Sequence, residues 1–224
     1  MALLEIDHLL ICVPEGFKAA EIAEKAGLQR GLSRAHKGQG TQNACYFFEN
    51  AYLEFLWARD ERELASEAVK PLGLAERMRW RETGACPVGA AFRFAIGIPK
   101  IIPVDTWPYQ APFLREGKNI PVITKPNRPE DPLISMSPNW YKKTILPPAP
   151  PAQLRHLGKP RKLTAVEITM PASYLPSPET AWCHDHGLLQ IEEGDACRLT
   201  IEWNNRKEGQ ILDLTPAIPL VIRY

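Results

Sequence analysis

Two ionisable side chains stand inside apolar segments of this chain, where they could do chemistry. Glu54 lies in 51–58, AYLEFLWA, where a buried carboxylate needs a charged or hydrogen-bonding partner. His8 lies in 4–13, LEIDHLLICV, and strand alternation lets each of the two side chains point inward. An imidazole with a carboxylate suits zinc, iron, manganese, cobalt or nickel. The structural alternatives are a hydrogen-bonded core histidine and a carboxylate in a salt bridge.

A polar loop over 28–41 holds the next candidates. His36 would touch a substrate or a metal at the rim of a cleft, or would simply be solvated. The run 38–41, GQGT, could offer backbone N–H groups to an anion, but it lacks the Gly-Lys-Ser/Thr ending of a phosphate-binding loop. Its glycines could equally permit a tight entry into the following strand.

Two further clusters each have a functional and a structural interpretation. Trp107, Tyr109 and Phe113 could wall an apolar pocket or cover a sheet face. The run 183–186, CHDH, has no second ligand pair at zinc-finger spacing, which favours a polar helix end over a metal site. The five cysteines are scattered and form no C-x-x-C motif, so we expect reduced thiols.

Length and composition narrow the class of protein. The 224 residues suffice for one large domain or two small ones, and the apolar fraction of 45% is ordinary for a globular protein. A formal net charge of +1 argues against non-specific nucleic-acid binding. The chain has no apolar run of ~18 residues and does not begin like a signal peptide. We therefore expect a cytoplasmic protein with a small-molecule partner, and neither nucleic acid nor membrane.

Periodicity and breaker residues predict mixed α and β elements. Thirteen of the 22 prolines lie in 99–151, which therefore cannot be a long helix or a central strand. We predict strands over 4–13, 42–48, 51–58, 89–98, 120–124, 133–137 and 162–171, with two more in 188–203 and one or two in 210–223. We predict helices over 15–26, over 60–69 behind an Asp60/Glu63 capping box, up to about 81, and over 177–187.

The order strand, helix, strand, strand, strand occurs twice, which indicates an internal repeat. Short sequence echoes support it at nearly constant spacing: 12–14 with 169–171, 43–45 with 195–197, and 53–55 with 212–214. The alternative is that two α+β halves share three-residue echoes by chance.

Three stretches, IDHLLICVP, GQGTQNACYFF and YLEFLWARDE, resemble a glyoxalase-like domain of the vicinal oxygen chelate superfamily, and TWPYQAPFLREG fits its longer branch. The resemblance implies an α+β fold in which paired βαβββ modules form a curled mixed β-sheet with a central cleft. The first module with added helices would span 1–98, a proline-rich insertion closing the cleft 99–160, and the second module 161–224. A ferredoxin-like pair is the alternative fold.

The resemblance also implies a site that holds one divalent ion, such as zinc, manganese, iron, nickel or magnesium. His8 and Glu54 would be its ligands, joined by Asp213, the repeat partner of Glu54. The repeat places Ala165 opposite His8, and alanine cannot ligate, so this site would be acid-rich with one imidazole. Glu54 or Glu167 would move the proton. The expected substrate-binding residues are His36, Thr41, Asn43, Trp107 and Tyr109.

The function implied is metal-assisted isomerase, lyase or ring-cleaving dioxygenase chemistry on a vicinal oxygen substrate. A ligand set with a single imidazole fits extradiol dioxygenation poorly, since that chemistry uses two histidines and one carboxylate. The alternative is a non-catalytic protein that binds or sequesters a small molecule and has a degenerate metal site. Proteins of this shape often pair modules across subunits, which makes a homodimer plausible.

Overall fold

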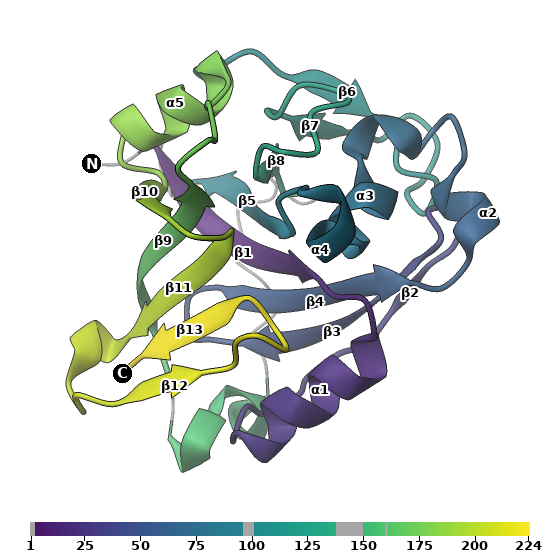
Figure 1. Cartoon of the computed structure of the whole chain (residues 1–224). Helices are drawn as coiled ribbons and strands as arrows, with labels where there is room; N and C mark the ends of the chain where they lie inside the picture. Colours follow the sequence, from purple (N-terminus) through teal and green to yellow (C-terminus); the bar gives the residue numbers. More distant parts are fainter. Residues whose placement is uncertain (1–2, 96–100, 138–149, 160) are drawn as a thin grey trace.

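The chain folds into two mixed β-sheets with short helices (Figure 1). The computed structural model describes residues 3–95, 101–137, 150–159 and 161–224. Its first elements are β1 (Leu4–Cys12), α1 (Gly16–Lys25), β2 (Ala35–His36), β3 (Thr41–Phe47), β4 (Tyr52–Ala58), α2 (Glu61–Leu64), η1 (Lys70–Leu72), α3 (Leu74–Met78), α4 (Trp80–Thr83) and β5 (Val88–Phe94). Then follow β6 (Trp107–Tyr109), β7 (Ile120–Val122), β8 (Leu133–Met136), η2 (Pro151–Leu154), η3 (His156–Gly158), β9 (Leu163–Pro171), α5 (Pro178–Asp185), β10 (Gln190–Gly194), β11 (Arg198–Trp203), η4 (Asn204–Arg206), β12 (Ile211–Asp213) and β13 (Leu220–Arg223). The predicted α+β class with a curled mixed sheet is confirmed.

The first sheet carries the strands that matter for the candidate site. Its order is β2-β3-β4-β1-β5-β8-β7-β6, with β1 parallel to β4 and antiparallel to β5. The strands predicted over 42–48 and 51–58 are β3 and β4, and they form an antiparallel hairpin with Phe47 paired with Tyr52 at its closed end. The proline-rich segment contributes β6, β7 and β8, two of them at the predicted positions.

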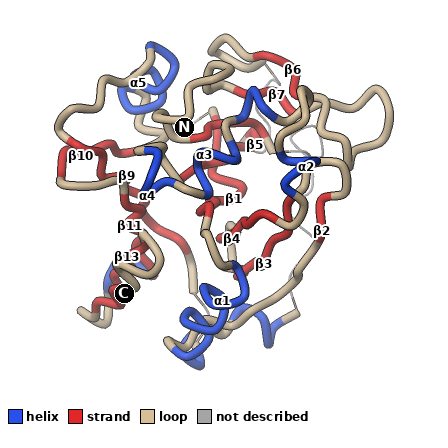
Figure 2. The backbone as a smooth tube through the Cα atoms, turned by 45° about the vertical axis from the view of Figure 1, so that its right-hand side comes forward, coloured by secondary structure: helices blue, strands red, loops and turns tan. Residues whose placement is uncertain are grey.

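Strand alternation divides the side chains of β1, β3 and β4 between two faces of this sheet. One face packs in a core shared with α1 and the second sheet, and it holds Leu9, Ile11, Ala44, Tyr46, Leu53 and Phe55. The opposite face holds Leu10, Cys12 and Leu56, which pack against α2, η1, α3 and the β6–β7 region. Figure 2 shows α3 next to β1, with α1 at the lower end of the molecule.

The second sheet repeats only part of the first. Its order is β10-β9-β11-β13-β12, with β9 parallel to β10 and antiparallel to β11. These pairings match those of β1 with β4 and β5, so the echo of 12–14 with 169–171 joins equivalent strand ends. The other two echoes do not. Residues 195–197 lie between β10 and β11, and 212–214 begin in β12, which pairs with β13 rather than with β9.

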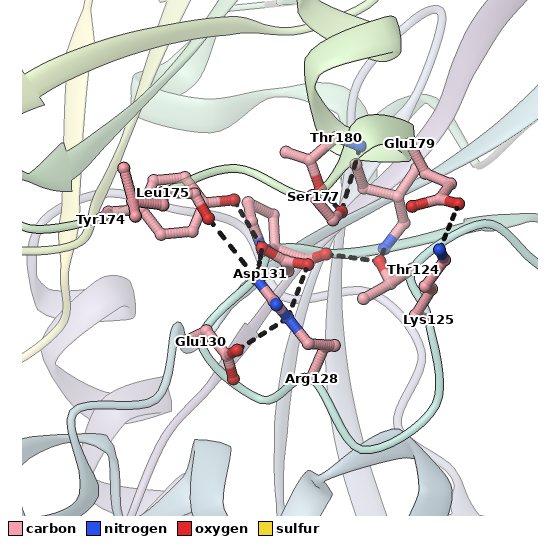
Figure 3. A network of polar contacts seen from close by, with 12 residues as sticks. Thr124, Lys125, Arg128, Glu130, Asp131, Tyr174, Leu175, Ser177, Glu179 and Thr180 are labelled. Carbon is pink, nitrogen blue, oxygen red and sulfur yellow. Dashed lines mark hydrogen bonds and ion pairs between the residues drawn. The ribbon is translucent and has the colours of Figure 1, made fainter.

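A polar network ties the loop between β7 and β8 to the loop between β9 and α5 (Figure 3). Asp131 is fully buried and accepts a hydrogen bond of 2.7 Å from the Tyr174 hydroxyl. Arg128 lies 3.4 Å from the same carboxylate, and Lys125 pairs with Glu179 at 3.2 Å. Because Tyr174 and Glu179 belong to the second half of the chain, these contacts fix that half against the first sheet.

The buried His156 makes a second junction. Its Nδ1 accepts the backbone N–H of Gln29 at 2.9 Å, its Nε2 donates to the Phe47 carbonyl at 2.7 Å, and its ring stacks on Trp203 at 5.5 Å. Burial lowers the pKa of His156 from its ordinary 6.5 to about 4, against the smaller raising effect of the Phe47 bond. The folded protein therefore holds this imidazole neutral.

We expect acid to destabilise the fold through His156. Between pH 6.5 and pH 4 the unfolded chain binds a proton that the folded chain refuses, so the free energy of unfolding falls as the pH falls. At ~1.4 kcal/mol per pKa unit, this group alone would remove about 3 kcal/mol across that window. Denaturant unfolding at pH 7 and pH 4 would measure the loss. In His156→Gln the pH dependence should shrink by about that amount, and an unchanged pH dependence would contradict the assignment.

The structure also bears on the cysteines and on membrane-spanning helices. All five cysteines are free and buried, in keeping with the reduced thiols expected from the sequence. None of the helices in the described ranges has the length and apolarity needed to cross a bilayer.

Candidate functional site

A cavity of about 770 Å³ lies on the face of the first sheet that holds Leu10 and Leu56. We call it the site cavity. Its lining comes from β1, β3, β4, β7 and β8, from Leu72 and Leu74, and from parts of 32–39 and 109–120. Every described lining residue lies between Asp7 and Ser137, so the second sheet contributes nothing to the cavity in the described ranges.

A β-bulge brings two neighbouring acid–base residues into this cavity. Ile6 pairs with Phe92 and His8 with Ala91, so two steps along β1 face one step along β5. Asp7 and His8 consequently both line the cavity, although neighbours in a regular strand would face opposite ways. The sequence gives no sign of this bulge, and Asp7 was missed for that reason.

Asp7 orients the imidazole of His8. The His8 Nδ1–H donates to Asp7 Oδ1 at 2.8 Å, and the ring stacks on Tyr52 with centroids 4.5 Å apart. Burial by itself would raise the pKa of Asp7. The hydrogen bond and charge of His8, helped by Ser137 and Arg93, instead hold that pKa below its ordinary 3.8. Asp7 is thus an ionised partner that keeps the proton on Nδ1 and leaves the Nε2 lone pair for the cavity.

Glu54 faces the other nitrogen of His8. Its Oε2 lies 3.9 Å from His8 Nε2, while its Oε1 accepts a hydrogen bond from Asn43 Nδ2 at 2.7 Å. Asn43 is fixed in turn, because its Oδ1 accepts the Arg34 backbone N–H at 2.7 Å. The structure therefore confirms that His8 and Glu54 share one face and shows that one carboxylate oxygen is left for chemistry beside the imidazole.

A second polar chain borders the first. The Tyr109 hydroxyl donates to Gln39 Oε1 at 2.8 Å, and Gln39 Nε2 donates to the Thr41 hydroxyl at 2.8 Å. Thr41 Oγ1 lies 2.9 Å from His36 Nδ1, and the His36 ring stacks on Phe113. Burial lowers the pKa of His36 below 6.5 and so favours the neutral ring. The predicted Tyr109, Thr41, His36 and Asn43 are thus brought together, with Gln39 as a link that the sequence reasoning missed.

The glycines around Gln39 serve a different purpose from anion binding. Gly38 and Gly40 have φ of 81° and 74°, a region that favours glycine. Their N–H groups both donate to Glu63 Oε2, at 2.7 and 3.0 Å. The N–H groups that an anion-binding loop would offer to a ligand are therefore already bonded to a carboxylate of the chain itself.

Three predicted site residues lie elsewhere. Glu167 in β9 pairs with Arg223 at 3.6 Å. Asp213 in β12 is exposed and accepts from the backbone N–H and the hydroxyl of Thr215, at 2.8 and 2.6 Å. Trp107 supports Tyr109 edge-on with ring centroids 6.2 Å apart, but it does not line the cavity. The structure does not join Asp213 or Glu167 to His8 and Glu54, because both belong to the second sheet.

The donors at His8 and Glu54 do not fit a resident divalent metal. No group of three or more His, Cys, Asp and Glu in the described ranges could hold an ion, and the remaining residues include none of these types. Structural and catalytic zinc sites use three or four protein ligands. The amide nitrogen of Asn43, a hydrogen-bond donor, lies between Glu54 and His36, 3.5 Å from His36 Nε2. Cys45 also lines the cavity, but burial raises its pKa and keeps the thiol protonated.

Residues 6–96 match the family model of a glyoxalase-like domain. Over these residues the chain is glyoxalase-like. This confirms the resemblance to the superfamily, and it covers β1, β3 and β4, which carry the acid–base residues of the cavity. No curated protein matches the sequence.

Solved structures extend the comparison to the whole chain. The crystal structure of a hypothetical protein from Staphylococcus aureus aligns with a TM-score of 0.52 and 12% identity, over 98% of this chain and 99% of that one. A mutant of 4-hydroxymandelate synthase from Streptomyces coelicolor aligns with a TM-score of 0.45 and 13% identity, over 99% of this chain and 63% of that one. At 12% identity, the alignment with the Staphylococcus aureus protein shows a shared fold alone.

Proposed function

We propose that this glyoxalase-like chain binds a small carbonyl compound in the site cavity and moves a proton on it, as in an isomerase. The observation that carries the proposal is the Asp7–His8–Glu54 arrangement inside a cavity of about 770 Å³. An imidazole oriented by a carboxylate, with its second nitrogen facing a cavity, is a competent general base.

The residues have separate roles in the proposed step. His8 Nε2 takes a proton from the carbon next to the substrate carbonyl, and the electron pair of that C–H bond becomes the enolate. Asp7 stabilises the imidazolium through Nδ1–H, and Glu54 Oε2, 3.9 Å from Nε2, stabilises the same charge from the other side. The proton then returns from Nε2 to the same carbon, and the electron pair of the enolate forms the new C–H bond as the carbonyl is restored.

Hydrogen exchange tests the proposal without knowledge of the physiological substrate. We would incubate the protein in D₂O with octan-2-one and with its carboxylated analogue 7-oxooctanoate, and follow loss of the protons beside the carbonyl by NMR. The proposal expects enzyme-dependent exchange with at least one of the two compounds. Binding without exchange would instead support the alternative, a protein that only sequesters its ligand.

Removal of metal is a second test, and it follows from the donor set. Because the chain offers two donors rather than three or four, we expect dialysis against EDTA to leave the exchange rate unchanged. The rate of the dialysed protein would be compared with that of protein supplied with zinc, manganese or iron(II). Loss of exchange that a single ion restores would favour the metal-dependent chemistry implied by the resemblance and would contradict this proposal.

A further inference from the structure

Two arginines at the mouth of the site cavity have no carboxylate partner. Arg34 and Arg115 both line the cavity and are both exposed. Neither forms an ion pair within the described ranges, and the remaining residues contain no Asp or Glu. Other arginines do pair, as Arg30 does with Glu24 at 3.0 Å. The mouth therefore carries positive charge that the chain itself does not neutralise.

Arg34 is placed by the same contacts that build the site. Its backbone N–H bonds Asn43, the residue that holds Glu54. Its guanidinium carbon lies 5.7 Å from the centre of the Phe113 ring, which stacks on His36. A guanidinium that contacts an aromatic ring through its face keeps its N–H edge for a planar anion, and a carboxylate matches that edge with two parallel hydrogen bonds.

The cavity is apolar along most of the remaining lining. Seven leucines line it together with Ile120 and Val122, and they are Leu10, Leu32, Leu56, Leu72, Leu74, Leu114 and Leu133. These side chains offer no hydrogen bond to a ligand. A cavity of this kind takes an apolar body and uses its few polar groups to set the direction in which that body lies.

We infer that the ligand of the site cavity is an apolar molecule that carries one carboxylate, which Arg34 and Arg115 bind at the mouth. The apolar part fills the leucine-lined region, and its carbonyl reaches His8. The inference rests on the proposed function in this last point alone, because binding of the carboxylate does not require proton transfer.

Calorimetric titration of the whole protein with 7-oxooctanoate and octan-2-one tests the inference directly. The two compounds share a methyl ketone and an apolar chain, and they differ in the terminal carboxylate. A charge-assisted hydrogen bond contributes ~1.5–3 kcal/mol, so we expect the acid to bind at least about tenfold more tightly than the ketone. Equal affinity for the two, including no binding of either at about 10 mM, would overturn the inference.

Variants identify the groups responsible. Arg34→Gln and Arg115→Gln should each weaken binding of the acid by about five- to tenfold while leaving octan-2-one unaffected. Arg62→Gln is the matched control, since Arg62 is exposed in α2 and does not line the cavity. Preference for the acid that survives in the double variant would overturn the assignment. Failure of the proposed function looks different: the acid then binds as expected, but no proton exchanges.

Discussion

Replacing His8 by Asn is expected to lower the exchange rate by about 10²- to 10⁴-fold, the range that general acid–base groups contribute. The amide nitrogen of Asn can take the place of Nδ1 and keep the bond to Asp7, now 2.8 Å long, while the base at Nε2 disappears. The measurement is the initial rate of deuterium incorporation at saturating 7-oxooctanoate, with binding of the acid followed separately.

The control for this variant is His184→Asn. It makes the same substitution at the C-terminal end of α5, where His184 is exposed and accepts the Ile191 backbone N–H at 3.1 Å, outside the site cavity. We expect its exchange rate to stay within about twofold of the unmodified protein, since surface changes away from a site have small effects. Exchange in His8→Asn at the same rate as in this control would remove His8 from the mechanism.

Replacing Arg77 by Met is expected to lower the free energy of unfolding by at least about 4 kcal/mol. Arg77 in α3 is 1% exposed, and its guanidinium donates to four backbone carbonyls. These belong to Leu72 at 3.0 Å, Cys86 at 2.7 Å, Asp131 at 2.6 Å and Arg128 at 3.1 Å. Methionine fills similar space but leaves all four carbonyls without this donor, and each buried unsatisfied group costs about 1–3 kcal/mol.

Denaturant unfolding measures this effect, with Arg79→Met as the control. Arg79 is exposed and follows the same helix, so its replacement should change the free energy of unfolding by less than about 0.5 kcal/mol. If Arg77→Met fails to fold, Arg77→Lys provides the measurement, because it keeps the charge and part of the donor set and should lose less. A loss below about 1 kcal/mol in Arg77→Met would contradict this account.

Arg77 also connects stability to the site. It joins η1 and α3 to the start of β5 and to the loop before β8, and Leu72 and Leu74 from this region wall the cavity. Arg77 thus supports the cavity wall, whereas Arg34 and Arg115 lie at the mouth of the cavity. Its partners are all backbone carbonyls that only the fold brings together, so no sequence motif marks it.

Residue patterns within one segment predicted the positions of individual strands and helices well. The predicted strand over 162–171 is β9 (Leu163–Pro171), and the predicted helix over 15–26 is α1 (Gly16–Lys25). Asp60 caps α2 by accepting the N–H groups of Arg62 and Glu63, as a capping box requires. Glu63 departs from that motif, because its carboxylate turns to Gly38 and Gly40 rather than back to Asp60. The helix predicted over 60–69 is correspondingly short.

The repeat was a weaker guide to the site. It matched Glu54 to Asp213, but Glu54 lies in the strand parallel to β1, whereas Asp213 lies in a strand that does not touch β9. The strand parallel to β9 is β10, where Gln190 pairs with Glu167 as Glu54 pairs with Leu10. A similarity over three residues reflects only which side chains are present. It does not show which neighbouring strand the backbone is hydrogen-bonded to.

The sequence by itself allowed His8 and Glu54 each to point inward from its own strand, because the side-chain period of a strand is two residues. That the two side chains share one face follows from the parallel pairing of β1 with β4. Only the tertiary structure decided what meets them there. The bulge that turns Asp7 to His8 depends on the register with β5, and Asn43 reaches Glu54 because β3 pairs with β4. The walls of the cavity come from segments far along the chain, since hydrogen bonds and packing between distant residues are set by the fold as a whole.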